Sequence, residues 1–218
     1  MKKDIIIFDF DDTIVESLKY WHYVFDKLMF KKYGFKDNKL FLAQKSGLSN
    51  KEIAELFIKV TKVNKTYQEI TDDWNEYMYY FYTTKIKLIP GIKEFLFKLK
   101  AQGKRLILAS ATQEHLIKKA LTHFGIDIFE EIFTETNLDA GKREKTFFEK
   151  LLKKLNTKPN EVFFFEDSFV SVKSAYNANI ECCAVITKLN KKHFDDFTPF
   201  VTAKIKNYKN IEKLNLFN

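Results

Sequence analysis

Acidic residues follow two of the most apolar runs in this sequence. Asp9 and Asp11 come directly after Ile5–Phe8, and Glu166-Asp167 comes directly after Phe163–Phe165. Continuous apolar runs of this kind indicate strands buried in a parallel sheet, and ligands of such sheets bind beyond the carboxyl ends of the strands. Carboxylates that gather there repel one another unless a proton or a cation is present, and oxygen ligands suit a hard cation such as Mg²⁺. The pattern therefore indicates a metal site, although strands also end in acidic turns that only face solvent.

A hydroxyl and a lysine that could hold a phosphate lie elsewhere in the chain. Ser110, Ala111 and Thr112 follow the apolar run Arg105–Ala109 and precede a helical segment. A hydroxyl and free backbone N–H groups at the start of a helix can cradle a phosphate, but Ser110 or Thr112 could also be an ordinary N-cap, which is the more common role. Lys142 precedes another helical segment, and alone it indicates little because most lysines are solvated.

Helical and strand patterns alternate from Gly91 onward, which predicts an α/β fold with a parallel sheet and right-handed crossovers. The expected helices cover 92–100, 114–124, 144–156 and 168–178. The expected strands cover 5–8, 105–109, 131–134, 161–165 and 180–186. Residues 189–218 are polar and weakly patterned, apart from an edge strand expected at 203–206.

A long insertion separates the first two strands. Roughly ninety residues lie between them, whereas a crossover between parallel strands needs only about a dozen. The insertion has helical periodicity at 17–33, 51–63 and 67–82, and its many tyrosines are expected mainly in a hydrophobic core. Pro90-Gly91 marks the return to the sheet. We therefore expect an α/β core domain of residues 1–14 and 89–218, and a helical domain of residues 15–88.

Composition is typical of a soluble globular protein. The 218 residues are 45% hydrophobic and 30% charged with only six Gly and three Pro, which argues against disorder. The net charge of +8 favours anionic substrates, but the lysines are scattered, so we expect no nucleic-acid partner. No apolar run reaches the roughly 18 residues of a membrane span. We expect no membrane association, a cytoplasmic location and a monomer.

The acidic stretch after the first strand carries a family resemblance. Residues 9–13, Asp-Phe-Asp-Asp-Thr, resemble the D-x-D-G-T motif of the haloacid dehalogenase-like (HAD) hydrolases, with Asp12 at the usual Gly position. Ser110, Lys142 and Glu166-Asp167 follow in the order and at the spacing of the family's other motifs. The set is most similar to the branch that holds β-phosphoglucomutases and phosphoglycolate phosphatases, although Arg-Glu-Lys follows Lys142 where that branch usually has P-x-P.

The resemblance implies a HAD-like core with a Rossmann-like parallel sheet, a helical cap at 15–88, and phosphoryl transfer through an aspartyl-phosphate. Asp9 would attack phosphorus, while Asp11 would protonate the leaving oxygen and then deprotonate the attacking water. The implied substrate is a small phosphorylated metabolite, and the implied cofactor is Mg²⁺. The implied metal ligands are oxygen donors: Asp9, the Asp11 backbone carbonyl, Glu166 and Asp167. The implied phosphate-binding residues are Ser110, Ala111 and Lys142.

The sequence leaves two alternatives to a phosphatase open. A phosphomutase would resemble the same core, but mutases carry an Arg just after a Gly-x-Ser loop in the cap, and here Asn50 follows Gly47-Leu48-Ser49. A non-catalytic phosphate-binding module on the same fold is the other alternative, because fold alone does not fix function. The presence of an acid at Asp11 favours phosphate-ester chemistry within the family, and Asn50 favours the phosphatase over the mutase.

Overall fold

The computed structural model describes residues 3–45, 48–214 and 216–217. Gly47, the first residue of the expected Gly-x-Ser loop, lies outside them. The chain divides into two compact units, one formed by Met1–Glu16 with Lys87–Asn218 and the other by Ser17–Ile86. Among the described helices, none has both the length and the apolar composition needed to cross a bilayer.

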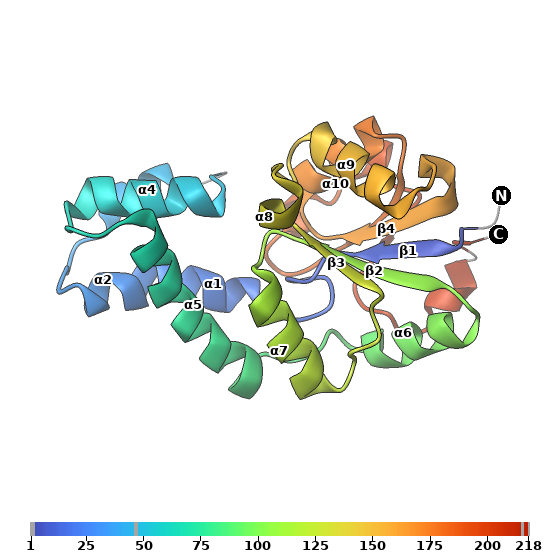
Figure 1. The fold of residues 1–218 in the computed structure, drawn as a ribbon, viewed down its shortest axis with the longest axis horizontal. Helices are drawn as coiled ribbons and strands as arrows, with labels where there is room; N and C mark the ends of the chain where they lie inside the picture. The colour runs from blue at the N-terminus through green and yellow to red at the C-terminus, as the bar shows by residue number, and fades with distance from the viewer. Residues whose placement is uncertain (1–2, 46–47, 215, 218) are drawn as a thin grey trace. The chain divides into compact units, whose positions relative to one another are not determined.

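The larger unit is built on a six-stranded parallel sheet in the order β3-β2-β1-β4-β5-β6 (Figure 1). Its strands are β1 Ile5–Phe8, β2 Arg105–Ser110, β3 Glu131–Thr134, β4 Val162–Glu166, β5 Glu181–Val185 and β6 Ala203–Ile205. The chain adds β2 and β3 on one side of β1 and then returns to add β4, β5 and β6 on the other. Phe8 is therefore in register with Leu108 on one neighbour and with Phe165 on the other. Residues that follow these three strands must meet at one edge of the sheet, where the strand order reverses.

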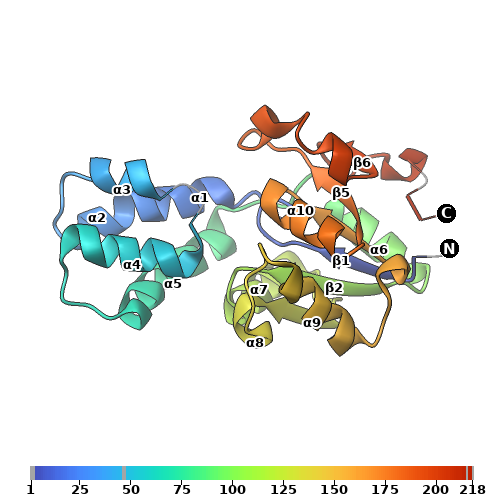
Figure 2. The same ribbon diagram turned by 90° about the horizontal axis from the view of Figure 1, so that it is seen from above.

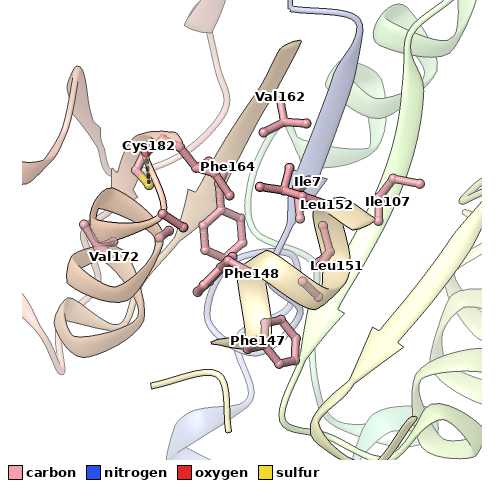
Figure 3. Close-up of a cluster of buried hydrophobic side chains, with 14 of the residues drawn as sticks. Ile7, Ile107, Phe147, Phe148, Leu151, Leu152, Val162, Phe164, Val172 and Cys182 are labelled. Carbon is pink, nitrogen blue, oxygen red and sulfur yellow. Dashed lines mark hydrogen bonds between the residues drawn. The ribbon is translucent and has the colours of Figure 1, made fainter. Parts of the chain in front are cut away.

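Helices cover both faces of this sheet (Figures 1 and 2). On one face, α9 (Lys145–Leu155) and α10 (Phe169–Asn177) pack on alternate residues of the strands, as Figure 3 shows for Ile7, Phe148 and Phe164. The rings of Phe148 and Phe164 meet edge to face with centroids 5.3 Å apart. This packing anchors the two carboxylate-bearing strands, β1 and β4, in one rigid core.

The opposite face is covered by α6 (Ile92–Ala101), α7 (Glu114–Phe124) and Tyr208 near the C-terminus. Phe8 and Phe165 stack across neighbouring strands with centroids 4.9 Å apart. Tyr208 packs on Phe95 of α6 at 5.5 Å, and its backbone N–H donates to the carbonyl of Pro90 at 2.9 Å. Residues 189–218 lack helical or strand periodicity, yet this region contributes to the core. It does so through isolated aromatic residues such as Tyr208, whose packing needs no periodic pattern.

Gly91 shows how tightly this last segment is fitted. Its φ is +83°, and an added Cβ would lie 2.8 Å from the backbone nitrogen of Lys209. Both the left-handed conformation and the close backbone approach require glycine here.

The smaller unit is helical. Its elements are α1 Leu18–Tyr23, the π-helical η1 Val24–Leu28, α2 Met29–Lys32, α3 Lys39–Gln44, α4 Asn50–Thr61 and α5 Tyr67–Thr84. Phe and Trp rings form its core, such as Phe25 against Trp74 at 4.9 Å and Phe30 against Phe57 at 5.0 Å. Capping boxes begin α4 at Ser49 and α5 at Thr66.

Three expectations for the helices differ from the structure. The tyrosines are the clearest case: Tyr82 is buried, but four of them are more than a third exposed, namely Tyr23, Tyr67, Tyr79 and Tyr80. A phenol needs a partner for its hydroxyl, so Phe and Trp fill the core instead. The single helix expected at 17–33 contains the π-helical segment η1, and α3 and α8 (Glu135–Leu138) are helices that periodicity did not predict because they are too short. The remaining helical turns are η2 Pro159–Glu161, η3 Lys191–His193, η4 Thr198–Phe200 and η5 Ile211–Leu214.

Candidate active site

Three carboxylates meet at the carboxyl ends of β1 and β4. Asp9 continues the ladder of β1, since its backbone N–H donates to the carbonyl of Phe165 at 2.9 Å, and Glu166 and Asp167 come next along β4. One oxygen from each of the three side chains lies within 4.8 Å of the others. All three residues are at most 6% exposed. The two apolar runs therefore deliver their acids to one buried place, as the sequence predicts.

Lys142 is inserted among these carboxylates. Its ammonium contacts Asp9 Oδ1, Glu166 Oε2 at 2.8 Å and the carbonyl oxygen of Ala109 at 3.1 Å. An ammonium has three N–H donors, so these acceptors can use all of them. The residue is 5% exposed, in contrast to the solvated lysine that composition alone would suggest. Its backbone N–H is held by Glu135 Oε1 at 2.8 Å, which fixes the loop before α9.

Backbone groups fix the orientation of the β4 acids. Glu166 Oε1 accepts the N–H groups of Asp167 at 2.9 Å and Ser168 at 2.8 Å, so its other oxygen is directed at Lys142. Asn190, which follows β5, donates from Nδ2 to the carbonyl of Asp167 at 2.7 Å and to the carbonyl of Val185 at 2.8 Å. The carboxyl ends of β4 and β5 are thereby held together.

The site carries more negative charge than Lys142 can balance. Burial raises the pKa of Asp9 well above its usual value, and the nearby Glu166 raises it further. Burial and Glu166 likewise raise the pKa of Asp167. Burial alone would lower the pKa of Lys142, but the Asp9 and Glu166 carboxylates raise it above its usual value. A cluster of three buried carboxylates beside one ammonium fits an additional cation, and an oxygen donor set suits a hard divalent ion.

Asp11 and Asp12 lie at the turn after β1 and differ from Asp9. Neither belongs to the trio of carboxylates whose oxygens converge. Asp11 Oδ2 accepts a hydrogen bond from the hydroxyl of Thr112 at 2.5 Å. Asp12 has a φ of +53°, and its N–H donates to the carbonyl of Val15 at 2.7 Å. The left-handed backbone explains why the motif usually has Gly here, and Asp is among the residues that adopt this conformation at small cost.

Ser110 and Thr112 form a tight turn at the end of β2. The N–H of Thr112 donates to Ser110 Oγ at 3.1 Å, and both residues are buried, whereas Ala111 between them is exposed. The helix that follows, α7, begins at Glu114 with Gln113 as its N-cap. An ordinary N-cap at Ser110 or Thr112, the more common role, is therefore wrong. The turn places Ser110 beside β1, since Phe8 is paired with Leu108.

The structure thus brings together Asp9, Lys142, Glu166 and Asp167, and it places Asp11 on Thr112 beside Ser110. Sequence reasoning missed three supporting residues, namely Thr112 as a partner of Asp11, Glu135 and Asn190. Glu135 and Asn190 carry no recognisable signal, because single polar residues after strands occur throughout this chain.

The chain is similar to known proteins in sequence and in fold. The haloacid dehalogenase-like hydrolase family matches residues 6–185. The chain is 24% identical over 233 aligned positions to the phosphoglycolate phosphatase of Psychrobacter arcticus, covering 95% of this chain and 98% of that protein. It is 21% identical to a phosphorylated carbohydrates phosphatase of Thermotoga maritima over 82% of both chains. The crystal structure of CbbY from Rhodobacter sphaeroides in complex with phosphate superposes with a TM-score of 0.82 at 20% identity, covering 99% of this chain and 100% of that one.

Proposed function

The chain belongs to the haloacid dehalogenase-like hydrolases, and from this premise we propose that it is a Mg²⁺-dependent phosphatase that hydrolyses a small phosphorylated metabolite through an aspartyl-phosphate on Asp9. One observation carries the proposal: Asp9, at the end of the central strand, lies in a buried cluster with Lys142, Glu166 and Asp167. Phosphoryl transfer through an aspartyl-phosphate needs such a positioned carboxylate, and it needs added positive charge to receive an anionic ester.

The residues present fit a divalent cation. We propose that Asp9, the backbone carbonyl of Asp11 and Asp167 hold Mg²⁺, with help from Glu166. When bound, Mg²⁺ would supply positive charge that offsets the repulsion between the carboxylate nucleophile and the phosphate.

Within this proposal the chain's own residues divide the chemistry. A carboxylate oxygen of Asp9 attacks phosphorus and forms a P–O bond, while the bond from phosphorus to the leaving oxygen breaks and Asp11 donates a proton to that oxygen. Asp11 then takes a proton from a water molecule, whose oxygen attacks phosphorus and releases Asp9.

The phosphoryl oxygens need donors during both steps. Ser110, the backbone N–H of Ala111 and Lys142 are proposed to supply them. Lys142 contacts three protein acceptors in this structure. It can therefore reach a phosphoryl oxygen by exchanging one of those contacts, and Asp9 is the natural one because its carboxylate loses its negative charge when the aspartyl-phosphate forms and the electron pair leaves with the departing oxygen. Lys142 would thus turn from Asp9 to the phosphoryl group during the first step.

The relatives and one residue of the helical unit support a proposal for the substrate class. The curated relatives act on phosphoglycolate and on phosphorylated carbohydrates, so we propose a small phosphorylated acid or sugar. Asn50, the first residue of α4, is a poor ligand for a second phosphate compared with Arg, whose planar fork binds phosphate through two hydrogen bonds. A mutase must hold a phosphorylated intermediate while it turns round, and Asn50 therefore favours hydrolysis over mutase chemistry.

The proposal is tested by measuring phosphate release with Mg²⁺ and with EDTA. Substrates would include p-nitrophenyl phosphate, phosphoglycolate and a panel of sugar phosphates, and conversion of β-glucose 1-phosphate to glucose 6-phosphate would be followed in parallel. We expect Mg²⁺-dependent phosphate release from at least one small metabolite and little isomerisation. A folded protein that releases no phosphate from any substrate would refute the proposal, and rapid isomerisation with little phosphate release would replace it by a mutase.

A further inference from the structure

The contact between Thr112 and Asp11 joins the ends of two neighbouring strands. Asp11 follows β1 and Thr112 follows β2, and the hydroxyl of Thr112 donates to Asp11 Oδ2 across a sequence separation of 101 positions. The separation of 2.5 Å lies at the short end of the range for O–H···O hydrogen bonds, about 2.5 to 3.0 Å. Thr112 is 3% exposed, while Asp11 is half-buried. The buried hydroxyl therefore holds a carboxyl group that can still reach solvent or substrate.

Thr112 is itself fixed from two sides. Its backbone N–H donates to Ser110 Oγ at 3.1 Å, which ties it to the end of β2. Its side chain is β-branched, and β-branched side chains have restricted χ1 rotation. A rigid donor of this kind sets the rotation of the carboxyl group that accepts its hydrogen bond, and it does so without a charge that would compete with Mg²⁺ or Lys142.

The same turn separates the tasks of two hydroxyl groups. Ser110 Oγ accepts the Thr112 N–H, and a hydroxyl that accepts one hydrogen bond can still donate its own hydrogen. Ser110 can therefore donate to a phosphoryl oxygen while Thr112 donates to Asp11. The turn consequently connects the group that would hold the phosphate to the group that would move the proton.

We propose that Thr112 is a positioning residue that orients Asp11 for proton transfer to the leaving oxygen. The inference rests on the proposed function, in which Asp11 is the general acid and base. In the first step Asp9 bonds to phosphorus, the bond to the leaving oxygen breaks, and the proton of Asp11 passes to that oxygen. Thr112 keeps its own proton throughout and acts only through the orientation of Asp11.

A purely structural role predicts something different from a positioning role. Loss of a structural hydrogen bond would slow all substrates alike, because it would disturb the whole site. Loss of Asp11 orientation would slow mainly those substrates whose leaving group needs a proton. An alkoxide is a poor leaving group without protonation, whereas p-nitrophenolate leaves without it.

The experiment compares Thr112→Val, which removes the hydroxyl at similar volume, with Thr112→Ser, which keeps the hydroxyl. The quantity is kcat/KM, which covers the steps up to departure of the leaving group, for p-nitrophenyl phosphate and for the best alkyl phosphate found in the substrate screen. We expect Thr112→Val to lower kcat/KM for the alkyl phosphate by about 10- to 100-fold, part of the usual range for general acid–base catalysis. For the aryl phosphate the loss should be only about threefold, and Thr112→Ser should restore both values to within about threefold of wild type.

The outcomes distinguish a failure of the role of Thr112 from a failure of the proposed phosphatase function. An equal loss on both substrates, or no loss on the alkyl phosphate, in a wild type that hydrolyses both would overturn the role of Thr112 and leave the phosphatase standing. A wild type that hydrolyses neither would instead overturn the proposed function. If Thr112→Val does not fold, as judged by thermal unfolding, Thr112→Ala provides the same comparison.

Discussion

The two compact units bury different kinds of side chains. In the larger unit, Met1–Glu16 with Lys87–Asn218, the described buried residues include seven charged ones, namely Lys3, Asp9, Asp12, Lys104, Lys142, Glu166 and Asp167. In the helical unit, Ser17–Ile86, the described buried polar residues are all uncharged, namely Ser17, Thr61, Thr71 and Asn75. Burying charge is expensive unless a partner offsets it. Among the described residues, only the larger unit therefore buries charged side chains, as active sites commonly do.

The ion pairs of the two units also differ in burial. Lys142 and its carboxylate partners are almost fully buried, whereas the pair between Lys32 and Asp73 in the helical unit is partly exposed. An exposed pair contributes little to stability, while a buried cluster with excess negative charge is costly to keep without a function. We therefore expect substitutions in the larger unit to change chemistry, and matched substitutions in the helical unit to leave chemistry with an aryl phosphate nearly unchanged.

The largest effect should come from Asp9. Asp9→Asn keeps the shape of the side chain but removes the nucleophile, so kcat should fall by at least about a thousandfold with every substrate. The loss should appear without a loss of fold, as judged by circular dichroism. The helical unit offers a control in Asn75→Asp, a change of comparable size at a buried position that should lower stability far more than kcat. Activity of Asp9→Asn within about tenfold of wild type would contradict the account.

Lys142→Met should have the next largest effect, because it leaves three buried carboxylates without their cation. Breaking a buried pair typically costs about 3 to 5 kcal/mol of unfolding free energy, and loss of the phosphate-binding donor should also lower kcat by about 100-fold or more. Lys32→Met in the helical unit is the matched control, with an expected cost below about 1 kcal/mol. Urea unfolding of both variants measures the difference, and equal costs would break the contrast between the units.

Asp167→Asn should stabilise the metal-free protein at neutral pH. The folded pKa of Asp167 is raised above its unfolded value by burial and by Glu166, so the folded state binds the proton more tightly and this carboxyl lowers stability as the pH rises above about 4. Relative to wild type in EDTA, the variant should have a higher unfolding free energy at pH 7 to 8. The gain should shrink toward pH 4.

Magnesium should reverse this order if Asp167 is a ligand. Added Mg²⁺ should raise the melting temperature of the wild type more than that of Asp167→Asn, because ligand binding stabilises the folded state. A variant that is less stable than wild type in EDTA at pH 8, or equally stabilised by Mg²⁺, would remove Asp167 from the proposed metal site.

The smallest effects should come from the helix caps, which occur in both units. Ser49→Ala removes the capping box of α4, and Thr134→Ala removes that of α8. Each should cost about 1 kcal/mol of stability. Only Thr134→Ala should also lower kcat with p-nitrophenyl phosphate, because α8 begins with Glu135, which holds the backbone of Lys142. Equal kinetic effects of the two variants would show that the contrast does not extend to the supporting helices.

Much of the larger unit could be predicted because its strands are strongly patterned. The four consecutive apolar residues of β1 and the acids that follow them predict a buried central strand and a charged strand end. The short helices α3 and α8 could not be predicted, since four to six residues carry too little periodicity. Tyr208 could not be placed either, because it lies in a weakly patterned segment and packs through tertiary contacts alone.

The candidate site could be predicted only in part, and for a physical reason. Asp9 and Asp167 follow apolar runs and can be predicted from that pattern. Lys142 by itself looks like any other lysine of a Lys-rich chain, and only its place in the order of the family motifs predicts it before the fold shows that it is buried. The partnership of Thr112 with Asp11 depends on the pairing of β1 with β2, and strand order is not encoded in local sequence. Residues that supply charge at strand ends are therefore predictable, while those that position them are not.

The most direct test of the account is to trap the aspartyl-phosphate. Wild-type protein turning over its best substrate with Mg²⁺ would be quenched in acid, digested, and analysed by mass spectrometry for a peptide that carries one phosphoryl group. We expect the modification on Asp9, its loss on treatment with hydroxylamine, and its absence from Asp9→Asn. A phosphoryl group on another residue would contradict a covalent role of Asp9. So would the absence of any phosphoryl group under conditions in which hydrolysis of the phosphorylated enzyme limits the rate.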